Sequence, residues 1–100
     1  MKEIGQKIEA HLQAPFPDGW RGKKYQEKDL TVLDSNVAGL IMAAVHGGGQ
    51  MSTRRRQELS DEVALLKALV PTISEAEPKS YFGRLLAIAE ETLGRVPVRR

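Results

Sequence analysis

Apolar residues recur at helical spacing in four segments of this sequence, and a proline or glycine follows each segment. The segments cover residues 2–14, 30–46, 53–70 and 78–93, and the residues that follow them are Pro15, Gly47, Pro71 and Gly94. Proline cannot continue the hydrogen-bond ladder of a helix, and glycine readily adopts the left-handed conformation found at helix ends. The pattern therefore predicts an all-α fold, a small four-helix bundle.

The residues at the starts of three segments agree with this division. Asp29 can cap the second helix, Ser52 or Thr53 can cap the third, and Pro78 suits the first turn of the fourth. A chain of 100 residues is the size of one ordinary domain. We expect a single helical domain over residues 1–94 and a frayed basic tail over residues 95–100.

A long loop over residues 15–28 separates the first two predicted helices and carries three aromatic residues, Phe16, Trp20 and Tyr25. Its stretch WRGKKY mixes rings with cations, which suits single-stranded nucleic acid because bases stack on rings and cations follow phosphates. The stretch also suits a loop whose Trp20 plugs one end of the bundle while the lysines stay in water. We favour the plug, because few other aromatic residues are available to the core. Residues 23–26 could pair briefly as a strand.

The composition and the residue spacing argue against a membrane helix and against metal-ligating or cysteine-based sites. The chain has no cysteine, a net charge of only +2 and no apolar run near the roughly 18 residues that a membrane helix needs. His11 and His46 lie 35 positions apart, without metal-ligand spacing, and we expect His11 to pack beside the apolar stripe of Ile4, Ile8 and Leu12. We therefore expect a cytoplasmic, non-enzymatic protein without a metal or cofactor.

Asp34 is the polar residue of the second helix that most needs a partner. If that helix is continuous from Leu30, Asp34 falls at the edge of its apolar face, while Ser35 and Asn36 face outward. Alternatively, Asp34 caps a shorter helix that begins after it. We favour the continuous helix, in which an unpaired carboxylate would cost several kcal/mol. The candidate partners in a structural ion pair are Arg55 and Arg56.

The arginine triplet Arg54, Arg55 and Arg56 lies in the first turn of the third predicted helix, where the helix dipole disfavours cations. Three interpretations stay open for it. The triplet is a solvated basic end, an internal partner of Asp34 or another acid, or a contact for an acidic partner or phosphate.

A protein-interaction module is the function that these features favour. Aromatic and arginine side chains dominate binding hot spots, and an acidic protein surface would complement the cations. A regulatory, immunity-like or inhibitory role fits such a module. The candidate partner-binding residues are Trp20, Arg21, Lys23, Lys24, Tyr25, Arg54, Arg55 and Arg56. The alternative is a nucleic-acid-binding regulator, since the second helix, the glycine turn and STRRRQEL resemble a helix-turn-helix.

Overall fold

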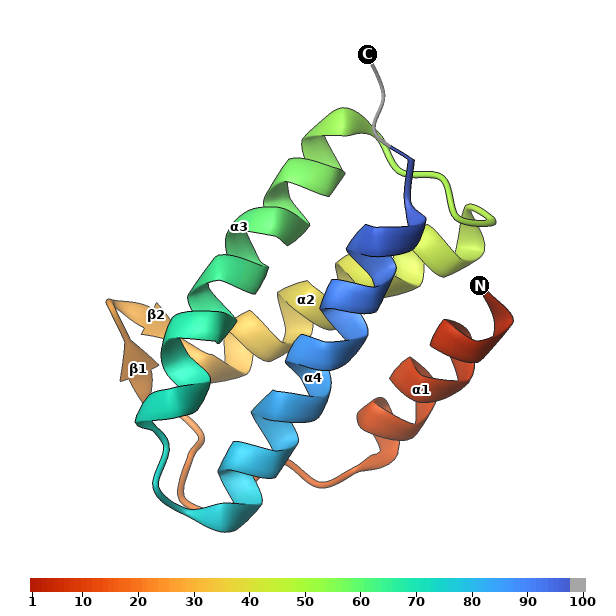
Figure 1. Ribbon diagram of the computed structural model, residues 1–100. Coiled ribbons are helices and arrows are strands. Elements are labelled where there is room, and N and C mark those ends of the chain that lie inside the picture. The colour runs from red at the N-terminus through yellow and green to blue at the C-terminus, as the bar shows by residue number, and fades with distance from the viewer. Residues whose placement is uncertain (98–100) are drawn as a thin grey trace.

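A computed structural model describes residues 1–97 and shows a mostly helical chain with one small hairpin (Figure 1). The predicted mostly helical fold is confirmed, whereas the all-α class is wrong because two short antiparallel strands precede the second helix. The elements are α1 (Lys2–Gln13), β1 (Lys24–Tyr25), β2 (Lys28–Asp29), α2 (Leu30–His46), α3 (Thr53–Leu69), a 3-10 turn (Val70–Thr72) and α4 (Ala76–Arg95).

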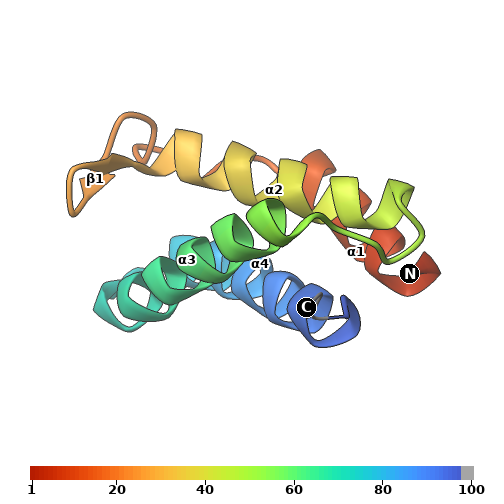
Figure 2. The same cartoon turned by 90° about the horizontal axis from the view of Figure 1, so that it is seen from above.

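Helices α2 and α4 are each in contact with all three other long helices, so the core is built around this pair. Figure 2 shows α2 on one side of the molecule and the crossed α3 and α4 on the other. Each fully buried leucine, isoleucine or phenylalanine in this core stabilises the fold by about 1.5–3 kcal/mol. The largest fully buried apolar side chains are Ile4, Ile8, Leu30, Leu33, Val37, Ile41, Leu59, Leu66, Phe82 and Leu85.

Helix α2 begins and ends where its capping residues predict. Asp29 Oδ1 accepts hydrogen bonds from the backbone N–H groups of Thr31 at 2.8 Å and Val32 at 3.2 Å. The helix is then continuous to His46, so Asp34 does not cap it. The predicted left-handed residue at Gly47 is wrong, because φ there is −83°, and the positive φ values fall on Gly48 and Gly49.

Helix α3 also begins as predicted, with the Ser52 hydroxyl accepting from the Arg55 N–H at 3.2 Å. Helix α4 is longer than predicted at both ends and continues through Gly94 to Arg95. Beyond it, the Val96 N–H donates to the Thr92 carbonyl and the Val96 side chain is buried. The first residues of the predicted tail are therefore ordered against the core, and residues 98–100 lie outside the described part of the chain.

Helix α1 buries a different third residue from the one its apolar stripe indicated. Ile4 and Ile8 are buried as expected, but Leu12 is 51% exposed and His11 lies in the core instead. Residues three and four apart share a helix face, so His11 continues the face of Ile4 and Ile8 as well as Leu12 would. A polar residue of α1 thus lies in the hydrophobic core, where it requires hydrogen-bond partners.

The hairpin turns through two residues that are not glycine. Lys24 pairs with Asp29 and Tyr25 with Lys28, which leaves Gln26 and Glu27 as the turn, with φ of 51° and 67°. Two successive left-handed residues make the turn that suits a two-residue hairpin, although Asn-Gly is the usual sequence for it. The hairpin thus holds the end of the long loop in a fixed register directly before α2.

Candidate functional site

A buried polar network joins three helices through Asp34. His11 Nε2 lies 2.6 Å from Asp34 Oδ1, and the Tyr81 hydroxyl donates to Asp34 Oδ2 at 2.9 Å. The His11 side chain is 2% exposed and the Asp34 side chain 17% exposed. Since α1, α2 and α4 each contribute one member, the network ties these helices to one another at a single point.

The environment of Tyr81 keeps its hydroxyl protonated. The His11 and Tyr81 ring centroids lie 4.5 Å apart, so the two residues that bind the Asp34 carboxylate also pack against each other. Burial raises the pKa of Tyr81 well above its ordinary range, and the hydrogen bond to Asp34 and the charge of Asp34 raise it further. Tyr81 is therefore a stable donor to the carboxylate at neutral pH.

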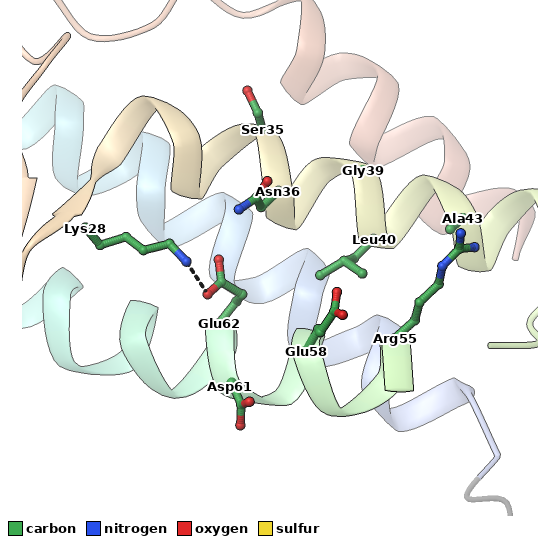
Figure 3. Close-up of a pocket in the computed structure, with 10 residues that line it drawn as sticks. All are labelled: Lys28, Ser35, Asn36, Gly39, Leu40, Ala43, Arg55, Glu58, Asp61 and Glu62. Carbon is green, nitrogen blue, oxygen red and sulfur yellow. Dashed lines mark hydrogen bonds and ion pairs between the residues drawn. The ribbon is translucent and has the colours of Figure 1, made fainter. Parts of the chain in front are cut away.

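The predicted ion pair of Asp34 with Arg55 or Arg56 is wrong. Asp34 and Asn36 lie about 200° apart on α2, and it is the face of Asn36 that α3 approaches. Arg55 extends from α3 to this outer face, near Ala43 (Figure 3), and among the described residues neither Arg55 nor Arg56 pairs with Asp34. The expectation that Asp34 lies at the edge of the core and has a structural partner holds, but its partners are His11 and Tyr81.

Trp20 is buried in the core rather than displayed on the surface. Its ring lies 6.0 Å from that of Phe82 on α4 and is 9% exposed. Phe16 packs edge-on against Tyr81 at 5.5 Å and Phe82 at 5.9 Å. The loop is thus anchored to α4 by its own aromatic residues, which agrees with the predicted plug and removes Trp20 from an exposed binding surface.

The positively charged side chains of the same loop are exposed, and two of them lie over the Phe16 and Trp20 rings. The Arg21 guanidinium lies over the Phe16 ring at 5.3 Å, and Lys23 Nζ lies over the Trp20 ring at 4.9 Å. Lys24 is exposed on β1. Within residues 1–97, no acidic side chain pairs with any of these three cations. We call Arg21, Lys23 and Lys24 the loop cations.

Lys28 fastens the hairpin to α3. Its Nζ donates to Glu62 Oε1 at 2.9 Å, and the Glu62 side chain is largely buried. Lys28 also stands at one end of a groove between α2 and α3 of about 570 Å³, which Arg55 reaches at the other end (Figure 3). Glu58 and Asp61 line the groove between them.

The three arginines of α3 have different surroundings. Arg54 pairs with Glu58 at 3.4 Å on the surface, while Arg55 is exposed beside the groove. Arg56 is half-buried, and its Nε has no hydrogen-bond partner among the described residues. Arg55 lies at the far end of the groove from Lys28, and the start of α3 lies away from the β1–β2 hairpin in Figure 1, so the triplet and the loop cations are separate clusters.

Two residues of the polar network were not among the predicted site residues. We predict only packing for His11 in the sequence analysis, and Tyr81 is not singled out there. A signal for both exists in the sequence, because each places a hydrogen-bonding group on a face that is otherwise apolar, as Asp34 does. Three such groups on three helices indicate one shared network.

Residues 1–97 hold no group of three or more histidine, aspartate or glutamate side chains that could bind a metal ion together. None of the described helices is long and apolar enough to cross a membrane. Comparison of the chain with known protein families, with curated proteins and with solved structures gives no match.

Proposed function

We propose that the protein is an interaction module that binds an acidic protein surface through the loop cations Arg21, Lys23 and Lys24. The observation that carries the proposal is that three exposed cations lie close together without acidic partners on an anchored loop. Elsewhere on the described surface, Lys7, Arg54, Lys67 and Arg95 each pair with an acid, and the exposed cations without an acidic partner, such as Lys2 and Lys79, do not cluster on one loop. The loop cations are therefore a cluster of positive charge that an acidic partner would neutralise.

The anchoring of the loop supports tight binding. Trp20 and Phe16 fix its first half against α4, while the hairpin register and the Lys28–Glu62 bond fix its second half. A surface that is already ordered loses little conformational entropy when it binds. Complementary charge would also speed association with an acidic partner. Tyr25 is half-buried on β1 next to Lys24, and it would add an aromatic side chain to the same surface.

The surroundings of the loop cations favour a protein over a nucleic acid. Trp20 is buried and Phe16 lies under Arg21, so neither offers a free face on which a base could stack. Exposed Asp18 and Glu27 flank the cations and would repel a phosphate backbone. An acidic protein surface, by contrast, can supply cations of its own for these two side chains.

We also propose a fold class and a cellular setting for the protein. We class the scaffold as a four-helix bundle, since each long helix contributes buried apolar residues to one core. The module would act in the cytoplasm, without catalysis or a cofactor, and in a regulatory, immunity-like or inhibitory role. The two arginines Arg54 and Arg55 would serve as a secondary contact, because both are exposed at the start of α3.

The test compares two double variants of equal charge change. Lys23→Glu/Lys24→Glu alters the loop cations, and Lys2→Glu/Lys79→Glu alters two exposed lysines elsewhere that lack acidic partners in the described structure. Each tagged protein is cross-linked in its native cells, and the protein that co-purifies with the wild type is then produced for calorimetry. We expect an acidic partner whose affinity falls at least about tenfold for the loop variant and little for the control.

Two results would overturn the proposal. Equal binding by the two double variants would show that the loop cations are not the contact. Recovery of DNA or RNA instead of a protein, with binding that weakens steeply as salt rises, would establish the nucleic-acid alternative.

A further inference from the structure

An apolar groove of about 480 Å³ lies between α1 and α4, which pack side by side and run in opposite directions (Figure 1). Most of its lining is apolar and comes from Ala10 and Ala14 on α1 and from Ala87 and Ile88 on α4. Three of these side chains are only methyl groups, so they fill little of the space between the helices. The groove has the size and the apolar walls of a small-molecule site.

A salt bridge between the two helices closes one end of the groove. Lys7 Nζ on α1 lies 2.8 Å from Glu91 Oε1 on α4, and Arg95 binds the other oxygen of Glu91 at 3.1 Å. The hydrogen bond from Lys7 lowers the pKa of Glu91. The charges at this end are therefore neutralised within the protein, and Lys7 can present its apolar stem to the groove that it lines.

A cation without an acidic partner lies at the other end of the groove. Arg84 precedes Glu91 by about two helical turns, roughly 10 Å along α4, and lies at the same end as Ala14. Its guanidinium donates to the Ser80 hydroxyl at 2.9 Å and pairs with no acid among residues 1–97. Arg84 is therefore able to bind an incoming carboxylate, which its planar fork fits well.

Arg21 adds to the positive potential at the open end. Its guanidinium lies over the Phe16 ring, which packs edge-on against Tyr81, one turn before Arg84 on α4. Burial and Asp34 raise the pKa of Tyr81, while the charges of Arg84 and Arg21 both act in the opposite direction, so both arginines lie near this hydroxyl. None of the described residues that line the groove is acidic. The groove thus combines apolar walls with one positive end.

We propose that this groove binds a free carboxylic acid with an alkyl chain of medium length, a medium-chain fatty acid. The carboxylate pairs with Arg84, and the chain lies along the alanine walls toward the bridge of Lys7 and Glu91. The closed end and the length of about two helical turns limit the chain that fits. The site does not depend on the proposed protein-binding surface, because none of the loop cations lines the groove.

Four related compounds test the ligand chemistry on the wild-type protein. Octanoate has both features, octanamide lacks the charge, octylammonium reverses it, and butanoate has a shorter chain. In amide NMR titrations with monomeric octanoate, we expect saturable shifts on α1 and α4 near Ala10 and Ala87. Octanamide should bind about fivefold more weakly, as expected for loss of an exposed charge pair, and octylammonium more weakly still. Butanoate should lose about twofold to fourfold in affinity per missing methylene.

Four single variants test the residues. Arg84→Gln should bind octanoate and octanamide equally, whereas Lys79→Gln, which removes an exposed cation elsewhere on α4, should keep the preference for octanoate. Ala87→Leu fills the groove and should abolish binding, whereas Ala68→Leu, at an exposed position of α3, should not alter it. The exposed positions of all four side chains make these substitutions compatible with the fold.

The double variant Lys23→Glu/Lys24→Glu separates this site from the proposed protein-binding surface. It should bind octanoate as the wild type does, because its substitutions lie outside the groove. Loss of the protein partner by this variant with octanoate binding retained would show that the two sites act independently.

Any of three results would disprove the site. These are no saturable shift with octanoate at millimolar concentration, equal binding of octanoate and octylammonium by the wild type, and unchanged binding in Ala87→Leu. Shifts of the same amides from an acidic, leucine-bearing helical peptide but not from octanoate would assign the groove to a protein segment instead. Shifts that depend on protein concentration alone, with no effect of octanoate, would assign it to a second copy of the chain.

Discussion

The inner polar network and the outer ion pairs of α3 join similar groups in different settings. Inside, Asp34 bonds to His11 and Tyr81, which come from two other helices. Outside, Arg54 reaches Glu58 one turn along the same helix, and the arginine side chain is 89% exposed. The inner contacts decide how three helices pack, whereas the outer contact joins two side chains that the helix already holds together.

The difference shows why the number of polar contacts is a poor measure of stability. Water replaces an exposed ion pair at almost no cost, so such a pair contributes about 0–1 kcal/mol. A buried carboxylate that loses its partners, or partners that lose their carboxylate, cannot be rescued by water in the same way. The inner network should therefore respond to single substitutions far more strongly than the outer pairs.

The largest effect is expected for Asp34→Ala. It leaves the His11 Nε2–H and the Tyr81 hydroxyl without an acceptor in the core, and each unsatisfied group costs about 1–3 kcal/mol. We expect a loss of about 3 kcal/mol in the free energy of unfolding, measured by urea denaturation. The matched control is Asp61→Ala on the surface of α3, where the lost contact is a single bond from Gln57 and the expected loss is below about 0.5 kcal/mol. Equal losses in the two variants would contradict the role assigned to the network.

A smaller effect with a distinctive pH dependence is expected for Tyr81→Phe. At neutral pH the variant loses one hydrogen bond to a charged group, which lowers the free energy of unfolding by about 1.5 kcal/mol. The pKa of Tyr81 is raised by burial and by Asp34, so the folded state holds this proton more tightly than the unfolded chain. Below about pH 10 both states are protonated and the stabilisation is complete. Above that pH the unfolded chain releases the proton first, and stability falls by up to about 1.4 kcal/mol per pH unit.

Tyr25→Phe separates this effect from the general alkaline loss caused by lysine titration. Tyr25 is half-buried in the hairpin and makes no hydrogen bond to Asp34, whose partners are His11 and Tyr81. Wild type and Tyr25→Phe should therefore share the steep alkaline loss, while Tyr81→Phe should show a shallower one. Three parallel stability curves above about pH 10 would argue against the raised pKa of Tyr81.

The same contrast explains which features could be predicted from the sequence. The caps of α2 and α3 were predictable, because Asp29 and Ser52 bond to amides two or three residues away. The continuous helix through Asp34 was predictable from the spacing of apolar residues alone. These features depend on neighbours along the chain, where sequence separation and spatial distance agree.

The partners of Asp34 could not be identified in this way. They depend on which face of α2 meets which helix, and α1 and α4 approach the face of Asp34 while α3 approaches the face of Asn36. A brief strand within residues 23–26 was foreseen, but the two-residue turn of the hairpin was not, since Gln26 and Glu27 are unusual in a left-handed turn. For the candidate site, the sequence indicated both the cations of the loop and the burial of Trp20 as a plug, but the position of the Trp20 ring beneath Lys23 was a matter of tertiary packing.

The smallest effect is expected at the outer pair of Arg54 and Glu58. A double-mutant cycle with Arg54→Ala and Glu58→Ala should give a coupling free energy of about 0.3–0.5 kcal/mol, because the pair is exposed and lies at i,i+4 spacing. The coupling should shrink toward zero at about 1 M salt, where charges are screened within roughly 3 Å. Coupling above about 1.5 kcal/mol, or coupling that persists in high salt, would show that the start of α3 is more enclosed than its exposure indicates. The contrast between an inner network that decides how the helices pack and outer ion pairs that contribute little to stability would then not hold for α3.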